Sequence, residues 1–177
     1  MFLYHYVPKQ NSVSETGLLS FSQNPNADIG YYIKRSGETT KDGIVSWMEN
    51  CFKGRSRGIR FFTTPLEWHS KSLKIKELID NCDLLQIDLE RLNKDGLVEA
   101  IYLKPSIFEK CNPPDIEHYK DEYLIKLNSV EDIDFNYAQT FDKCDDDKGL
   151  RMAPLRFYVL VIKDGIIPPQ YITKLKG

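Results

Sequence analysis

The chain has 177 residues, of which 41% are hydrophobic and 28% are charged. This length and balance are typical of a globular protein, so we expect a single domain covering residues 1–177. The formal net charge of −2 argues against a general nucleic-acid or membrane-surface binder. No membrane span or leader segment is recognised, so we expect a cytoplasmic protein, with secretion as an effector left open.

The first third of the chain is predicted to contain a strand, some helical turns and one clear helix. Residues 2–7 are rich in aromatic and β-branched residues and end before Pro8, which predicts a strand. Residues 12–19 are predicted to form one or two helical turns. Residues 40–52 place apolar residues at i, i+3, i+4 and i+7, which predicts an amphipathic helix with Cys51 on its buried face.

The rest of the chain is predicted to be mostly strands. We expect a second helix at residues 73–79 and strands at residues 59–64, 82–89, 97–103, 119–127 and 155–162. The run 155–162 is almost continuously apolar, which is typical of a strand buried on both faces. This order of elements predicts an α+β fold with a mixed or antiparallel sheet core and with helices mainly in the first half of the chain.

A basic cluster follows the predicted amphipathic helix. Arg55, Arg57 and Arg60 alternate with Gly54 and Gly58. Guanidinium groups bind phosphate through parallel N–H donors, and glycines allow a close approach of the backbone. The pattern therefore fits a pyrophosphate or an acidic partner, although an ordinary solvated turn has the same composition.

The cysteines and acidic residues do not form a recognised metal motif. The four cysteines are widely spaced and none belongs to a CxxC pair, so a zinc site is not indicated. The acidic run at residues 142–147 lacks the ligand spacing of a calcium loop. We expect no metal. A cysteine nucleophile, with Cys111 as the most exposed thiol, is the weaker alternative.

Five short segments occur along the chain in a characteristic order. They are Leu3-Tyr4-His5, Gly17-Leu18-Leu19, Ile59 to Pro65, Gln86 to Leu89 and Ile167 to Ile172. Taken together, the segments resemble the ADP-ribosyltransferase fold in its compact bacterial and toxin-type forms. The RNA 2′-phosphotransferases are relatives of the same fold.

The resemblance implies that the protein binds NAD as a substrate and transfers ADP-ribose to an unidentified acceptor. It implies that His5 contacts the dinucleotide and that Tyr31 or Tyr32 stacks on nicotinamide. The other NAD-binding residues that we predict are Arg35, Arg57, Arg60 and Thr63.

The resemblance also implies a glutamate that stabilises the positive charge developing on the ribose as nicotinamide leaves. Many relatives carry it near the last core strand, but residues 149–158 contain two arginines and no glutamate. We therefore consider Glu67 and Glu99 as the acid, with His5 as a further catalytic residue. The alternative is a non-catalytic interaction protein that binds an acidic partner through Arg55, Arg57 and Arg60.

Overall fold

The computed structural model describes residues 1–9, 11–66, 79–105, 124–137 and 155–176. The described helices are α1 (Val13–Thr16), α2 (Gly30–Ser36), α3 (Lys41–Cys51) and α5 (Leu89–Lys94), with 3-10 turns η1 (Arg55–Arg57), η4 (Val130–Asp132), η6 (Lys163–Gly165) and η7 (Pro169–Tyr171). The strands are β1 (Phe2–Pro8), β2 (Leu18–Leu19), β3 (Gly58–Phe61), β4 (Cys82–Asp88), β5 (Val98–Lys104), β6 (Ile125–Leu127), β7 (Phe157–Ile162), β8 (Ile166–Ile167) and β9 (Ile172–Lys176).

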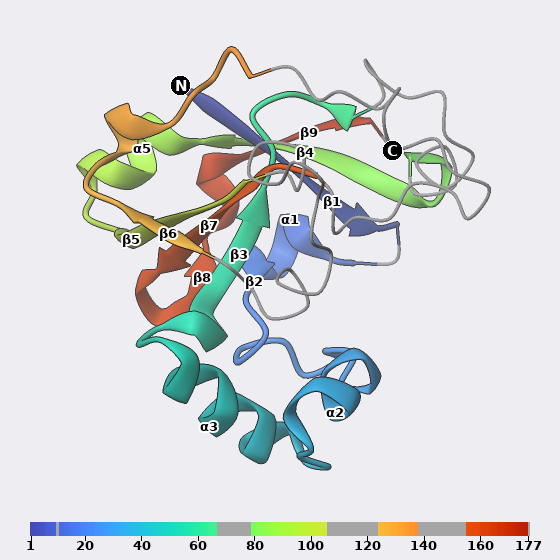
Figure 1. The fold of residues 1–177 in the computed structure, drawn as a ribbon. Helices are drawn as coiled ribbons and strands as arrows, with labels where there is room; N and C mark the ends of the chain where they lie inside the picture. The colour runs from blue at the N-terminus through green and yellow to red at the C-terminus, as the bar shows by residue number, and fades with distance from the viewer. Residues whose placement is uncertain (10, 67–78, 106–123, 138–154, 177) are drawn as a thin grey trace, which may run out of the picture.

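Two sheets form the body of the molecule. The first sheet has the order β1-β4-β9, and the large sheet has the order β3-β7-β5-β6. An isolated bridge between Tyr4 and Phe62 connects the two sheets. Every strand pair in the described part of the chain is antiparallel. Helices α2 and α3 lie together at one end, away from β1, β4 and β9 (Figure 1). The α+β class is thus confirmed.

Helix α3 begins where the sequence predicts. The Thr40 side chain accepts a hydrogen bond from the Gly43 backbone N–H at 3.1 Å and so caps the first turn. Ile44 and Met48, one turn apart, are the buried residues of the helix. The prediction of a buried Cys51 was wrong, because this residue ends the helix beyond its last buried position and is exposed.

Strand β7 divides the interior into two clusters. Its alternate residues Tyr158, Leu160 and Ile162 belong to the main core, which lies between the two sheets. Phe157 and Val159 belong to a smaller cluster on the outer side of the large sheet. All six residues of β7 are buried, so the predicted strand buried on both faces is confirmed.

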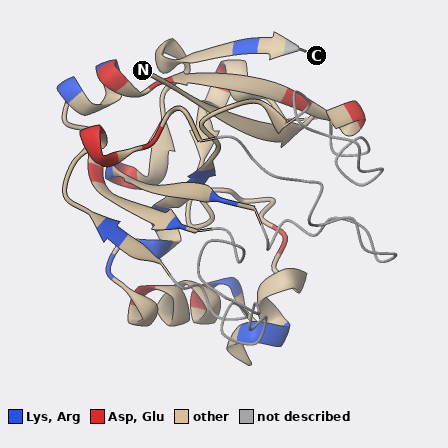
Figure 2. Ribbon diagram, turned by 45° about the horizontal axis from the view of Figure 1, so that its top comes forward, with Lys and Arg blue, Asp and Glu red and all other residues tan. Residues whose placement is uncertain are grey.

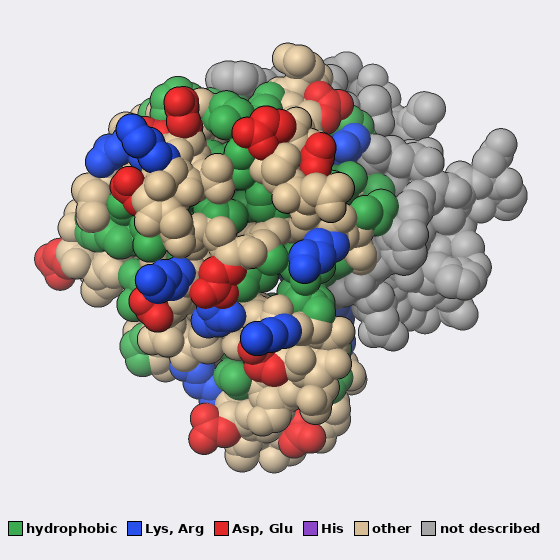
Figure 3. Space-filling view, turned by 90° about the vertical axis from the view of Figure 1, so that its left-hand side faces the viewer, with side chains coloured by type: hydrophobic (Ala, Val, Ile, Leu, Met, Phe, Trp, Pro, Cys, Tyr) green, Lys and Arg blue, Asp and Glu red, His purple; other side chains and the backbone are tan. Residues whose placement is uncertain are grey.

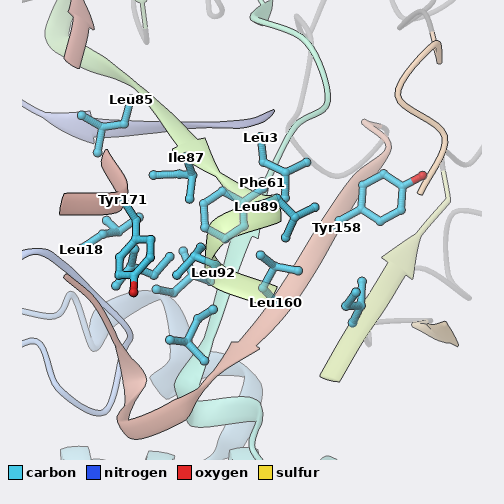
Figure 4. Close-up of a cluster of buried hydrophobic side chains, with 14 of the residues drawn as sticks. Leu3, Leu18, Phe61, Leu85, Ile87, Leu89, Leu92, Tyr158, Leu160 and Tyr171 are labelled. Atoms are coloured by element: carbon cyan, nitrogen blue, oxygen red, sulfur yellow. The ribbon is translucent and has the colours of Figure 1, made fainter. Parts of the chain in front are cut away.

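The main core draws on both ends of the chain. Figure 4 shows Leu3 and Ile87 of the first sheet converging with Phe61 and Leu160 of the large sheet. All four side chains are fully buried. This packing fixes the position of β1 against β3, and therefore the position of His5 relative to Arg60.

Five of the described helices and strands were not predicted from the sequence: α2, β2, α5, β8 and β9. The helical turns predicted at residues 12–19 are confirmed only at α1, because residues 18–19 pair with β8 as a strand. Most of the predicted helix at residues 73–79 and of the predicted strand at residues 119–127 lies outside the described residues. Within the described residues, no helix combines the length and the apolar character that a membrane crossing requires.

Candidate functional site

A hollow on the outer side of the large sheet is lined by two of the predicted arginines and one predicted tyrosine. Its cavity volume is about 40 Å³, within a wider space of about 420 Å³ that includes the open mouth. It lies between the large sheet and helices α2 and α3, and we call it the arginine pocket. Its lining residues are Phe21, Tyr32, Met48, Phe52, Arg55, Gly58, Arg60, Leu124, Phe157 and Val159.

Aromatic rings hold both guanidinium groups of the arginine pocket. The Arg60 guanidinium lies 5.0 Å from the centre of the Phe157 ring, and that of Arg55 lies 4.4 Å from the Trp47 ring. Arg55 is only 8% exposed, although it carries a charge. Stacking uses the flat face of a guanidinium, whereas phosphate is bound by its N–H edge. The arrangement places two positive charges in the wall of the hollow.

An edge-to-face aromatic group forms another part of the wall. The Tyr32 ring lies 4.9 Å from the Phe21 ring and 5.0 Å from the Tyr31 ring, both in T-shaped contacts. Tyr31 is 48% exposed, and the Arg35 guanidinium lies 4.7 Å from its ring centre. Of the predicted tyrosine pair, Tyr32 lines the pocket and Tyr31 does not.

The Glu49 carboxylate of α3 holds the backbone of residues 54–56, which we call the basic loop. Glu49 accepts hydrogen bonds from the backbone N–H groups of Gly54 and Ser56, each at 3.0 Å, and from the Ser56 hydroxyl at 3.1 Å. Burial alone would raise the pKa of Glu49, but the hydrogen bonds from Ser56 and Gly54 outweigh it and lower the pKa. These N–H groups are thus already used, so they do not serve as donors to a ligand in the pocket.

Arg57 and Glu99, predicted to bind NAD and to act as the acid, are paired with each other. Arg57 Nη1 lies 2.5 Å from Glu99 Oε2 and also donates to the Ile162 carbonyl at 3.4 Å. The side chains of the pair are 25% and 40% exposed, and neither residue lines the arginine pocket.

His5 lies on the inner side of the large sheet. Its Nδ1 is 2.6 Å from the Arg60 carbonyl oxygen, and its ring centre is 5.5 Å from that of Phe61. Because a carbonyl only accepts, Nδ1 carries the proton and Nε2 is the acceptor of the neutral ring. Burial lowers the pKa of His5, the hydrogen bond to Arg60 raises it and the Arg60 charge lowers it, with a net decrease. His5 is not among the residues that line the arginine pocket.

The remaining predicted residues are not brought into the pocket by the described structure. Thr63 follows β3 and is half-buried, and it does not line the pocket. Glu67, the other candidate acid, lies outside the described residues. Among the residues that the structure does describe, no group of three or more histidine, cysteine, aspartate or glutamate side chains is placed to hold a metal ion.

The three arginines of the predicted acidic-partner surface have different surroundings. Arg55 is buried under Trp47, Arg57 is paired with Glu99, and Arg60 stacks on Phe157. Figure 2 shows basic and acidic residues scattered over the ribbon, and on the face drawn in Figure 3 the two signs are interspersed. The three side chains do not share one exposed face.

The sequence alone did not indicate the aromatic walls or the loop anchor. Phe21, Phe52 and Phe157 come from distant parts of the chain, so their convergence has no local signal. Glu49 has no motif that distinguishes it from any other helical glutamate. Arg55, Arg60 and Tyr32 could be found because they stand in a basic cluster and in a tyrosine pair.

Comparison with known proteins leaves the resemblance resting on the short segments alone. No protein-family model, curated protein or solved structure matches the chain.

Proposed function

We propose that the arginine pocket binds a nucleotide, with NAD as the ligand, and that the protein is an ADP-ribosyltransferase-like enzyme. One observation carries the proposal. Arg55, Arg60 and Tyr32 belong to three separate elements, and all three line one hollow. The resemblance implies NAD contacts for Arg60 and for Tyr31 or Tyr32.

The chemistry of the lining fits the two parts of a nucleotide. Guanidinium groups pair with phosphate oxygens through charge-assisted hydrogen bonds, and aromatic rings offer contact area to a flat base. The enclosed part of the hollow is small, with a cavity volume of about 40 Å³, so only a small part of a nucleotide would enter it. The rest of the dinucleotide would extend beyond the open mouth.

The proposed reaction breaks the bond between nicotinamide and the ribose carbon, and nicotinamide leaves with the bonding electrons. A nucleophilic atom of the acceptor then bonds to that carbon and gives up its proton. NAD is consumed as a substrate, and no further cofactor is needed. A carboxylate favours the positively charged transition state. Glu99 can serve only if its ion pair with Arg57 opens, and Glu67 is the second candidate acid.

His5 has an indirect role in this proposal. Its hydrogen bond to the Arg60 carbonyl fixes the backbone of β3 where the Arg60 side chain enters the pocket. His5 is therefore a positioning residue here, and the direct contact with the dinucleotide that the resemblance implies is not part of the proposal.

The test follows the melting temperature of the protein with NAD, ADP-ribose and nicotinamide, each at millimolar concentration. A ligand that binds only the native state raises the melting temperature. We expect NAD and ADP-ribose to raise it and nicotinamide alone to have little effect, since the phosphates carry the binding. Release of nicotinamide from NAD tests the reaction separately. No rise with NAD or ADP-ribose would end the binding proposal, and binding without release would end the enzyme proposal.

A further inference from the structure

A second hollow lies between the end of the first sheet and helix α1, and it contains none of the residues predicted for NAD. Its cavity volume is about 340 Å³, which suits a small organic molecule. Its walls include Val7 of β1, Leu85 of β4 and Ile172 of β9, and the exposed Ser14 of α1 lies at the rim. We call it the Asp83 pocket.

Asp83 is the buried polar group of this pocket. Its side chain is only 6% exposed, and its Oδ2 accepts a hydrogen bond from Lys174 Nζ at 2.7 Å. Its other oxygen, Oδ1, is buried and has no hydrogen-bond partner. A buried acceptor without a partner destabilises the folded protein, and most buried polar atoms in native proteins therefore have a donor.

The strand register explains why Asp83 faces the pocket. Asp83 pairs with Val7, and Leu85 pairs with His5, so Asp83 and Leu85 share the inner face of the first sheet. Leu85 also pairs with Lys174 of β9, which brings the ammonium group within reach of the carboxylate. The carboxylate therefore stands at the end of an apolar row, where a donor on an apolar molecule can reach it.

The charges around Asp83 decide which class of ligand fits. Lys174 already neutralises the carboxylate through Oδ2 and is 56% exposed, so it stands at the solvent side of the pocket. A cationic ligand would compete with this ammonium group and be repelled by it. A neutral hydroxyl or amide N–H can satisfy Oδ1 and leave the ion pair intact.

We propose that the Asp83 pocket binds a small, neutral, partly apolar molecule whose hydroxyl or amide N–H donates a hydrogen bond to Asp83 Oδ1. The apolar part of the molecule packs against Val7, Leu85 and Ile172. The site is separate from the arginine pocket, and its test does not depend on nucleotide binding.

The experiment titrates the protein with two isomers and follows the backbone amide signals by NMR. The probes are 4-methylbenzyl alcohol, which has a hydroxyl donor, and 4-methylanisole, which has the same composition and no donor. We expect the signals of Val7, Asp83, Leu85 and Ile172 to shift, and the alcohol to bind about tenfold more tightly than the ether. Equal affinities, or no shift at these residues because water alone satisfies Oδ1, would overturn the proposal.

Charge-matched variants assign the effect to Asp83. Asp83→Leu removes the acceptor and should bring the affinity for the alcohol down to that for the ether. Glu15→Gln removes one negative charge from an exposed position on α1 and should leave both affinities unchanged. Unchanged preference for the alcohol in Asp83→Leu contradicts the assignment.

Two further measurements keep the proposal testable if Asp83→Leu does not fold. Ser14→Trp places a large ring at the rim and should weaken alcohol binding at least tenfold without touching Asp83; unaltered binding places the alcohol elsewhere. The cation 4-methylbenzylamine should bind more weakly than the alcohol. Tighter binding of the amine overturns the assignment to a neutral ligand.

Discussion

The two faces of the large sheet differ in what they contact. On the inner face, Ile59 and Phe61 of β3 pack with Leu160 in the main core. On the outer face, Gly58 and Arg60 line the arginine pocket. Successive side chains of a strand point to opposite faces. One strand can therefore carry stability with one set of residues and a binding surface with the other.

His5 and Arg60 show that two residues joined by a hydrogen bond can lie on opposite faces of the large sheet. One hydrogen bond joins the imidazole to the Arg60 backbone, yet the imidazole lies on the inner side and the Arg60 side chain on the outer side. Two residues can thus be direct neighbours without sharing a site. The predictions that follow separate the roles of the two faces.

The largest effect is expected from truncating the inner face. Leu160→Ala removes a fully buried side chain and should lower the free energy of unfolding by about 2–5 kcal/mol. Val159→Ala, on the outer face of the same strand, should cost about 1.5 kcal/mol because it removes fewer buried carbons. Urea denaturation measures both. A loss in Leu160→Ala no larger than in Val159→Ala would show that the inner face is not the main core.

Glu49→Gln should come next, because it removes the carboxylate that holds the basic loop. We expect the free energy of unfolding to fall by about 1–3 kcal/mol, as for hydrogen bonds to a charged group. Since folding lowers the pKa of Glu49, its contribution is complete above the ordinary glutamate pKa of about 4.3 and is lost as the pH falls further. The wild type should therefore lose stability below this pH more steeply than Glu49→Gln. Glu15→Gln, at an exposed position, is the control and should behave like the wild type.

A smaller, pH-dependent effect is expected at His5. Folding lowers its pKa, so the unfolded chain binds a proton more readily than the native protein below about pH 6.5. The contribution of His5 to the free energy of unfolding is complete above this pH and declines as the pH falls toward the pKa of His5 in the folded protein. Gln can keep a donor to the Arg60 carbonyl but does not titrate. Melting temperatures between pH 5 and pH 7 should fall less in His5→Gln, and parallel curves for the two proteins would contradict the assignment.

Arg57→Gln should have the smallest effect on stability. The ion pair with Glu99 is partly exposed, and such pairs contribute about 0–1 kcal/mol. The same variant tests the acidic-partner alternative, since Arg57 belongs to the cluster and its side chain is 25% exposed. Capture of an acidic peptide that is lost in Arg57→Gln would support that alternative, and unchanged capture would exclude Arg57 as its contact.

Strong local patterns made much of the fold predictable. Residues 40–52 carry a helical apolar period and a threonine cap, and residues 155–162 form a nearly continuous apolar run, so α3 and β7 were both predicted. Helix α5 could have been predicted from its sequence. Asp88 caps the helix, and Leu89 and Leu92 form its buried side. Strand β9 has two lysines among its five residues and is held in the sheet by pairing with β4.

Helix α2 and the pocket had weaker signals. Helix α2 has no buried residue, so no apolar period indicates it. For the site, local composition pointed to Arg55, Arg60 and Tyr32, whereas the partners of His5, Arg57 and Glu99 depend on strand pairing across the sheet. A single sequence does not show which face of a strand meets which neighbour.

The most direct test of nucleotide binding in the arginine pocket compares two arginine variants that differ in position and not in charge. Titration calorimetry measures the affinity for NAD of the wild type, Arg60→Gln and Arg57→Gln. Arg60→Gln should weaken binding about 10- to 100-fold, since hydrogen bonds to charged groups contribute about 1.5–3 kcal/mol, while Arg57→Gln should bind as the wild type does. Equal affinity of Arg60→Gln and the wild type would contradict a nucleotide site in this pocket.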